Sequence, residues 1–550
     1  MSSRTLALVL LAVVFFALRI PGLDAPYQQD EFKSVVASEK SLASASAFLL
    51  HPPLVAALLR ADAIVFGGEH MRVLPLISGA LSALLLFLVV RRRFDERTAY
   101  ISVALFAVSF YGVWSSLMVD MDGAVLPFAF LAAVYGYDRL RAASDRQWLW
   151  ALFLIVALLF GFLVKLSFIL VLGALMFDAL IEYCALLTPR RVMLALLSVA
   201  GFALLTIGAF FLAGVLNPAF DLAGMLTHAD SYAEGSGRNW LQVLVQAIKA
   251  LYYLSPLLLA PLLLLSRDIA VRARIFIIYM LLACVFYFVL FDFSRGALDK
   301  YLMFSVVPLA VLSGAALIRM FRDAPSLGLA RSLVFGIGYS AFLLFLNFLP
   351  HEVSALYPKT AWFSSIMQGR LNILTPFNGG SGPAGFYVSL LFIFAVFALS
   401  FLAAAVARVI PRFQKGAAVL IVLAGLSYNA VFIEEFSFGK IHGSVSEVLS
   451  ASLSSLEQAS KVITYNDIGA YELSAAGKYA GRFYAAPQFE AEHRERFTRH
   501  AEEGGVFLVI GIPPLYEGFY TEYFEGCTIL FATRSKAIEG IVYGACQATP

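Results

Sequence analysis

The feature that most constrains this chain is a series of apolar segments, each about as long as a membrane-spanning helix. A helix needs roughly 20 apolar residues to cross a hydrocarbon core of about 30 Å, and such segments recur over most of the 550-residue sequence. The composition agrees, with 61% hydrophobic residues, 14% charged residues and a mean hydropathy of +0.82. These values exclude an ordinary soluble protein and predict a polytopic α-helical membrane protein.

Thirteen segments qualify as candidate spans. The first lacks a small-residue cleavage site, so we expect a retained helix and not a cleaved signal peptide. The candidate spans are residues 5–21, 73–91, 98–115, 122–138, 147–163, 167–187, 192–214, 249–265, 275–292, 301–318, 331–349, 384–406 and 416–433.

Arginine placement orients these spans. With a cytoplasmic N-terminus, every predicted inner loop carries at least two arginines: RRRFDER, RLRAASDR, TPRR, SRDIAVRAR, IRMFRDAPSLGLAR and ARVIPRFQKG. The predicted outer segments hold most of the loop length, in 22–72, 215–248, 350–383 and the tail from about 434. An odd number of spans places the C-terminus outside. The net charge of +3 is too small to predict nucleic-acid binding.

The chain is therefore expected to have a membrane domain, 1–433, and an extracytoplasmic α/β domain, 434–550. In the second domain, strand-like segments KVITY, GVFLVIGI, CTILFAT and GIVYGAC alternate with turn residues. Cys527 and Cys546 bracket a predicted hairpin. An oxidising compartment would allow them to form a disulfide, and a pair of unbridged cysteines is the alternative.

The first outer loop, 22–72, is expected to form amphipathic helices on the membrane surface. The run LVAALLRADAIVFGG is too charged for a span, and the proline pair before it favours a helix start. His51 would then lie near the positive end of this helix.

Within that loop, the stretch YQQDEFKS (27–34) places Asp30 and Lys33 on one face of a helix, with Glu31 about 100° away. The two carboxylates are therefore expected to differ in role. The alternative is a solvated helix start with a local ion pair.

A second pair of carboxylates lies in SSLMVDMDGAVLPF, where Asp120 and Asp122 occupy the tightest predicted outer turn. Acids in a one-turn loop at a membrane surface indicate a functional site or, for Asp122, an N-cap of the next helix. Since Asp30 and Asp122 both lie on the predicted outer side, we expect them to line one cavity.

Basic residues at the same predicted level are Lys165, Arg295 and Lys300, and Tyr301 follows directly. Ammonium and guanidinium groups at a bilayer surface can bind lipid phosphate. The alternative is that these side chains only extend toward the membrane interface to keep their charge in water. All seven histidines also fall on the outer side, without metal-ligand spacing, so no metal site is predicted.

The order of these motifs resembles the GT-C glycosyltransferases, among them protein O-mannosyltransferases and the bacterial transferases that add aminoarabinose or galacturonic acid to lipid A. The resemblance covers about residues 1–320. It is carried by an Asp-Glu pair after the first span, a residue before Pro-Pro-Leu, an Arg-rich inner turn, an Asp at the third-to-fourth turn and a Lys-Tyr-Leu segment. Here these are Asp30-Glu31, His51 before PPL, RRRFDER, Asp122 and Lys300-Tyr301-Leu302.

The resemblance implies transfer of a sugar from a polyprenyl-phosphate donor, with inversion, to an acceptor on the outer face. Asp30 matches the family's proposed general base, and Lys33 matches a basic residue that contacts the donor phosphate. The aminoarabinose transferases usually have Lys at the position of His51, preceded by Glu where this chain has Leu50. Because of this departure, no phosphate or metal role is carried over to His51.

The chemistry is consistent with these residues. A carboxylate removes the acceptor's proton, and fixed cations stabilise the departing polyprenyl phosphate, so no cofactor is required and a divalent metal is left open. We expect Asp30 as base, Asp122 as a second acid and Lys33, Lys300 and Arg295 at the phosphate. Residues expected to line the site are Glu31, His51, Asp120, Lys165 and Tyr301.

The predicted partners are a polyprenyl-phosphate-linked sugar, the lipid bilayer and a glycolipid, glycan or protein acceptor. The expected location is the bacterial inner membrane, with the active site on the periplasmic side. One alternative is a flippase for lipid-linked sugars or another secondary transporter, although the chain shows no internal repeat and its charges gather at the outer boundary. Another is an inactive member that only binds a carrier lipid.

Overall fold

The computed structural model describes most of the chain, as a helical membrane domain with small sheets. The residues outside this description are 1–2, 143–144, 185–187, 231–237, 239, 292–297, 324–328, 354–363, 378–384, 484–498, 501, 512–523, 525 and 547–550.

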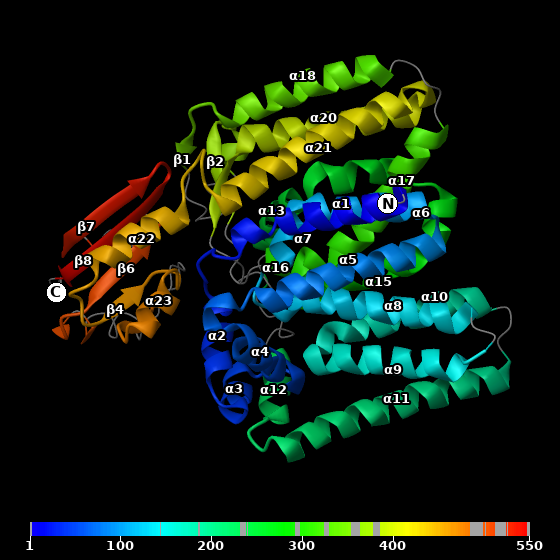
Figure 1. Cartoon of the computed structure of the whole chain (residues 1–550), viewed down its shortest axis with the longest axis horizontal. Coiled ribbons are helices and arrows are strands. Elements are labelled where there is room, and N and C mark those ends of the chain that lie inside the picture. The colour runs from blue at the N-terminus through cyan, green and yellow to red at the C-terminus, as the bar shows by residue number, and fades with distance from the viewer. Residues whose placement is uncertain are drawn as a thin grey trace. The chain divides into compact units, whose positions relative to one another are not determined.

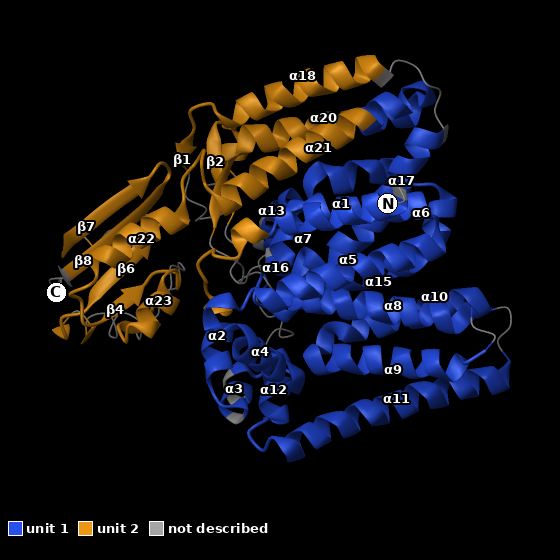
Figure 2. Ribbon diagram, in the orientation of Figure 1, with its two compact units in different colours: residues 1–19, 34–327, 403–418 blue, residues 20–33, 328–402, 419–550 orange. Residues whose placement is uncertain are grey.

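The chain divides into two compact units (Figure 2). Unit 1 comprises residues 1–19, 34–327 and 403–418, and unit 2 comprises 20–33, 328–402 and 419–550. This division by spatial contact differs from the linear boundary expected at 433/434, which stays a prediction. One boundary falls inside a helix, directly after Lys33.

The segment that the sequence predicts as the first outer loop forms short helices, as expected. Pro53 is the first residue of one of them, where its fixed φ suits the helix and its missing N–H costs nothing. The elements of this region are η1 (Ile20–Gly22), α2 (Asp30–Glu39), α3 (Leu42–Leu49), α4 (Pro53–Phe66) and η2 (Gly68–His70).

The rest of unit 1 is a helical bundle (Figure 1), in which α8 packs on α5 and α9, and α17 packs on α6. Its elements are α1 (Ser3–Ala17), α5 (Val73–Arg93), α6 (Glu96–Val108), α7 (Phe110–Ser115), η3 (Met121–Val125), α8 (Leu126–Ala142), α9 (Gln147–Val164), η4 (Leu166–Phe168), α10 (Ile169–Tyr183), α11 (Pro189–Leu216), α12 (Leu222–Asp230), α13 (Trp240–Leu259), η6 (Ala260–Leu264), α14 (Arg267–Arg272), α15 (Arg274–Val285), η7 (Phe286–Leu290), α16 (Leu298–Tyr301), η8 (Leu302–Ser305) and α17 (Val306–Asp323).

Ten helices in the described part of the chain are long and apolar enough to cross a membrane, so the predicted count of thirteen is not confirmed. Three expected spans, 98–115, 122–138 and 275–292, fall outside this set. The first is divided at Ser109, whose extended backbone ends α6 and whose hydroxyl caps α7. The second begins with the π-helical turn η3, and the third forms only a shorter apolar helix, Arg274–Leu290.

Ion pairs join helices of unit 1 at the ends where the sequence places the inner loops. Arg93 of α5 makes two hydrogen bonds to Asp138 of α8, of 2.6 and 2.7 Å. Arg274 of α15 donates to Asp178 of α10 at 2.8 Å, and Tyr137 donates to the same carboxylate at 3.0 Å. Four helices are thus connected through the clusters of arginine that set the predicted topology.

Unit 2 contains three long helices and a small sheet of order β1-β2-β3, which the sequence analysis did not anticipate. Asn347 at the end of α18 accepts a hydrogen bond from the backbone of Ser389, which directly precedes α20. The elements are α18 (Leu329–Asn347), β1 (Glu352–Val353), β2 (Ile373–Phe377), β3 (Phe386–Ser389), α20 (Leu390–Val409), η9 (Pro411–Phe413) and α21 (Gln414–Ser437); the middle of the α20–α21 hairpin, 403–418, belongs to unit 1.

The C-terminal part of unit 2 is the predicted α/β domain. Its five-stranded sheet has the order β5-β4-β6-β8-β7, in which β4, β5 and β6 are parallel and β7 and β8 form an antiparallel hairpin. The elements are α22 (Val445–Ser455), β4 (Val462–Thr464), α23 (Ala470–Ala475), β5 (Tyr479–Arg482), β6 (Val506–Ile510), β7 (Cys527–Ser535) and β8 (Ile538–Cys546).

All four strand-like segments form strands. Among the strands that the structure describes in this domain, β5 was missed, because YAGR carries little β-branched or aromatic signal. Val448 and Leu449 of α22 pack with Leu508 and Val542 in the core of the domain. Cys527 is disulfide-bonded, and its backbone partner across the hairpin is Cys546.

Candidate functional site

The tight turn before α8 places two acids beside each other in unit 1. Asp120 caps η3, since its side chain accepts hydrogen bonds from the backbone N–H groups of Met121 and Asp122. The alternative role of Asp122 as an N-cap is therefore wrong, because the cap lies two residues earlier, at Asp120. This leaves the Asp122 carboxylate, which is buried, available for other partners.

Two features hold this turn in place. Buried Arg72 donates a hydrogen bond of 2.8 Å to the carbonyl oxygen of Leu117, just before the acids. At Gly123 a Cβ atom would lie 2.4 Å from the carbonyl oxygen of Ser115, so the close approach of the two backbone segments requires glycine.

Each acid is paired with a lysine from another part of the bundle. Lys165, in the break between α9 and η4, donates to Asp122, and Lys300 of α16 pairs with Asp120. The two aspartates, from one turn, thus hold two lysines from distant parts of the sequence. Lys300 is nearly completely buried, whereas the side chain of Lys165 is 26% exposed.

Electrostatics favour the charged forms at this cluster. Burial acts to raise the pKa of Asp120, but the charges of Lys300 and Lys165 outweigh it and hold the pKa below its usual range. Burial likewise acts to lower the pKa of Lys165, but the charges of Asp122, Tyr301 and Asp120 together outweigh it, so the pKa is raised. Asp120 is therefore a carboxylate and Lys165 an ammonium group near neutral pH.

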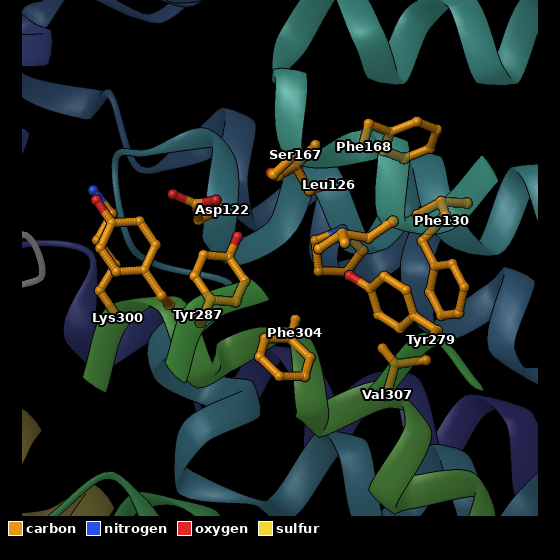
Figure 3. Close-up of a pocket in the computed structure, with 14 residues that line it drawn as sticks. Asp122, Leu126, Phe130, Ser167, Phe168, Tyr279, Tyr287, Lys300, Phe304 and Val307 are labelled. Atoms are coloured by element: carbon orange, nitrogen blue, oxygen red, sulfur yellow. The ribbon is translucent and has the colours of Figure 1, made fainter. Parts of the chain in front are cut away.

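Aromatic rings adjoin the charges. The ring of Tyr301 lies 5.2 Å from Nζ of Lys165 and 5.5 Å from Nζ of Lys300, within cation–π range, and Tyr287 stacks on Tyr301 at 5.4 Å. In Figure 3 the polar groups of Asp122, Tyr287 and Lys300 lie together at one side of a cavity.

That cavity also has an apolar side, formed by residues such as Phe130 and Val307 (Figure 3). Its volume of about 20 Å³ admits roughly one water molecule. A larger ligand would therefore have to displace side chains. The two lysines could exchange their aspartate partners for an anionic ligand. An anion such as phosphate competes for them directly.

His51 lies close enough to Asp120 to contribute to lowering the pKa of that carboxyl. Its ring centroid is 6.4 Å from that of His228 in α12. Among the residues that the structure describes, no group of three or more His, Cys, Asp or Glu side chains could hold a metal ion.

The predicted residues of the first loop, Asp30, Glu31 and Lys33, belong to unit 2. Asp30 is exposed at the start of α2, Glu31 is fully buried and Lys33 is partly buried, so the two carboxylates do have different surroundings. Since Asp30 and Asp122 belong to different units, their expected meeting in one cavity stays a prediction.

The structure therefore brings together Asp120, Asp122, Lys165, Lys300 and Tyr301, with His51 nearby. Arg295 lies outside the described residues. Sequence analysis missed Tyr287, Tyr279 and Ser167 as cavity residues and His228 beside His51. The tyrosines sit in apolar runs where an aromatic residue carries no sign of function, so only packing distinguishes them.

Comparison with known proteins gives one family match. The family model described as dolichyl-phosphate-mannose-protein mannosyltransferase matches residues 50–213, which include the acidic turn and Lys165. No curated protein matches the sequence.

Among solved structures, ArnT from Cupriavidus metallidurans bound to undecaprenyl phosphate has a TM-score of 0.57 and 14% identity, with 98% of each chain covered. The apo state of the same protein gives a TM-score of 0.54 and 15% identity over 98% of each chain. An oligosaccharyltransferase from Archaeoglobus fulgidus is a weaker match, with a TM-score of 0.32 and 13% identity over 92% of this chain and 67% of its own.

The likeness to ArnT extends over nearly the whole chain and includes the C-terminal domain. It confirms the predicted fold class, and the family-model match over residues 50–213 agrees with the resemblance noted in the sequence. The chain is an integral membrane protein that shares its fold with ArnT, and its residues 50–213 match the mannosyltransferase family model.

Proposed function

We propose that this protein transfers a sugar from a polyprenyl-phosphate donor to an acceptor at the outer face of the membrane, with inversion at the anomeric carbon. The observation that carries the proposal is the paired cluster of Asp120, Asp122, Lys165 and Lys300 in a fold shared with an ArnT that binds undecaprenyl phosphate. The acceptor is a glycolipid, a glycan or a protein.

In this proposal the lysines bind the phosphate of the carrier. As the bond between the sugar and the phosphate oxygen breaks, negative charge grows on that oxygen, and a fixed ammonium group stabilises it most in the transition state. Asp120 and Asp122 orient the lysines before the donor arrives. Tyr301, within reach of both ammonium groups, helps to keep them in place.

Asp30 is the proposed general base. It would take the proton from the acceptor's hydroxyl or amino group as that group attacks the anomeric carbon, so the bond to the acceptor forms while the bond to the phosphate breaks. The assignment rests on the sequence resemblance and on the exposure of Asp30. Lys33, one helical turn further, is the proposed additional contact to the donor phosphate.

The test uses the full chain, purified and reconstituted, with radiolabelled undecaprenyl-phosphate donors carrying aminoarabinose, galacturonic acid or mannose and a total membrane lipid and protein extract as acceptor. Asp30→Asn should lower the rate of transfer about 100-fold or more, because it removes the base, and should leave undecaprenyl phosphate binding unchanged. Full transfer by Asp30→Asn would reject the assigned base.

The lysines are tested by the affinity for undecaprenyl phosphate itself. Lys300→Ala should weaken binding about 10- to 100-fold, since a charge-assisted hydrogen bond is lost. Lys461→Ala is the matched control, because this lysine is half exposed on the C-terminal domain. Equal affinity in the wild type and Lys300→Ala would reject the phosphate site. Donor translocation without transfer would instead support a flippase.

A further inference from the structure

The segment that carries Asp30 packs on the C-terminal domain inside unit 2. The ring of Tyr27 lies 5.4 Å from that of Tyr471 on α23, and the ring of Phe32 lies 5.1 Å from that of Tyr479 on β5. Both contacts are edge-to-face, and Tyr27 and Phe32 are buried. Along the sequence, the proposed base thus lies between two residues that anchor its segment to the domain.

One anchor point, Tyr479, is the first residue of β5, the outermost strand of the sheet, and the other, Tyr471, lies on α23 just before it. Strands β4 and β5 are parallel, and their carboxyl ends meet where Thr464 is paired in register with Arg482. Functional groups in open α/β sheets gather outside the carboxyl ends of parallel strands. At this edge the loop after β4 carries Asp467, and β5 ends with Arg482.

Asp467 and Arg482 form an ion pair, with 2.8 Å between Oδ2 and Nη1. The Tyr479 hydroxyl donates a hydrogen bond of 2.7 Å to the other carboxylate oxygen, Oδ1. Only 8% of the Asp467 side chain and 20% of the Arg482 side chain are exposed. Asp467 has a φ of 59°, in the left-handed region, so these partners hold an unfavourable backbone conformation in place.

Tyr479 joins the two sets of contacts, because its ring meets Phe32 while its hydroxyl binds Asp467. Asp30 also acts on Asp467 directly. Burial raises the pKa of the Asp467 carboxyl and the negative charge of Asp30 adds to the rise, whereas Arg482 and Tyr479 oppose it. Such an effect requires the two carboxylates to be near each other.

We propose that Asp467, Arg482 and Tyr479 are positioning residues for Asp30, so that the extracytoplasmic domain is a working part of the glycosyltransferase. The inference rests on the proposed role of Asp30 as base. The ion pair fixes Tyr479, Tyr479 and Tyr471 hold the segment from Tyr27 to Phe32, and the segment orients the Asp30 carboxylate. The base is exposed, so without these contacts its segment would have greater freedom to move.

The first test is hydrogen–deuterium exchange on the full chain in nanodiscs. Arg482→Ala and Tyr479→Ala should speed exchange of amides 27–33 about tenfold, whereas Tyr479→Phe, which keeps the ring, should change it less. Glu503→Gln is the control, because it breaks the exposed 3.0 Å ion pair with Lys461 elsewhere in the same domain. Unchanged exchange of 27–33 in all variants would overturn the proposal.

The second test is kinetic and uses the donor that the wild type accepts. Arg482→Ala should lower kcat about 10- to 100-fold with little change in KM for the donor. The reason is that a displaced Asp30 no longer accepts the proton in the transition state, whereas donor binding does not depend on it. Arg482→Lys should recover part of this loss. A lower kcat with unchanged stability in Glu503→Gln would indicate a general effect of the domain and would reject the specific role.

A pH profile separates positioning from mere folding. The groups with the largest effects on Asp467 are Arg482 and Tyr479 from β5 and Asp30 from α2. Asp467→Asn removes a negative charge near Asp30, so the acidic limb of the kcat/KM profile should move to lower pH. An unshifted limb would contradict the coupling. If the wild type transfers no sugar but exchange responds as expected, the proposed function fails and the anchoring stands.

Discussion

At the scale of single residues, Asp62 in α4 is the buried carboxylate whose surroundings most clearly affect stability. Both of its oxygens are buried without a hydrogen-bond partner among the described residues. Burial raises its pKa to about 7, and the nearby backbone amide of Leu74 opposes the rise. The folded state therefore favours the neutral acid, and ionisation acts against folding.

The sign of the pH dependence follows from this. Between the unfolded value of 3.8 and the folded value of about 7, the folded protein binds more protons, so the contribution of Asp62 to stability falls as pH rises. We expect Asp62→Asn to raise the thermal midpoint in detergent, and by more at pH 8 than at pH 5. Exposed Asp145→Asn is the control. An equal gain at both pH values would contradict this prediction.

A second prediction at this scale concerns Gly123, because the absence of a Cβ atom at this position lets the acidic turn form. Gly123→Ala would place Cβ 2.4 Å from a backbone oxygen, so the turn must open and Asp120 and Asp122 must shift. We expect weaker undecaprenyl phosphate binding in equilibrium binding measurements. Gly201→Ala is the matched control, since nothing lies within 4 Å of a Cβ there. Identical affinity in both variants would show that the turn tolerates the change.

At the scale of helices, the ion pair between Arg93 of α5 and Asp138 of α8 joins these two helices, and breaking it tests how much it contributes to stability. Both side chains are buried, at 11% and 7% exposure, so removing one charge leaves the other without compensation. Asp138→Asn should cost about 3–5 kcal/mol of unfolding free energy. Chemical denaturation in detergent measures this.

The control for this helix contact is Glu539→Gln, which breaks an ion pair of 3.4 Å whose side chains are 62% and 50% exposed. Exposed pairs contribute about 0–1 kcal/mol, so little change is expected. If both substitutions had equally small effects, α5 and α8 would be held by apolar packing alone.

At the scale of the whole molecule, the orientation in the membrane decides which face carries the chemistry. In a Cys184→Ser background, Ser454→Cys on α22 should react with an impermeant maleimide from outside, and Asp145→Cys should react only after permeabilisation. The positive-inside distribution of arginine is the physical reason. The reverse labelling pattern would place the C-terminal domain in the cytoplasm and would contradict the proposed function.

Much of the architecture was accessible from the sequence because the hydrophobic pattern acts locally. A segment of about 20 apolar residues must be helical in lipid whatever its neighbours are. The segment Val506–Ile510 is likewise predicted as a strand from its own β-branched and aromatic residues. Prediction failed where packing divided a segment. Ser109 ends one helix and caps another inside an apolar run, and β5 depends on pairing with β4.

For the candidate site, the sequence supplied the residue types and their predicted side of the membrane. It could not supply the ionic partners of the two acids. Lys165 is 43 residues from Asp122 in the sequence, and Lys300 is 180 residues from Asp120. Nor did it distinguish which acid caps the helix. Those outcomes depend on how the chain returns to the same place in space, which short motifs do not encode.

The sequence by itself determined that this is a polytopic helical membrane protein with a C-terminal α/β domain, because lipid imposes its demand on each segment separately. Only the tertiary structure decided which charges meet. It paired the acids of one turn with lysines from two distant breaks between helices, and it attached the segment of Asp30 to the edge of a sheet more than 400 residues later in the chain. The physical reason is that buried charges require compensation, and the compensating groups are chosen by packing, not by distance along the sequence.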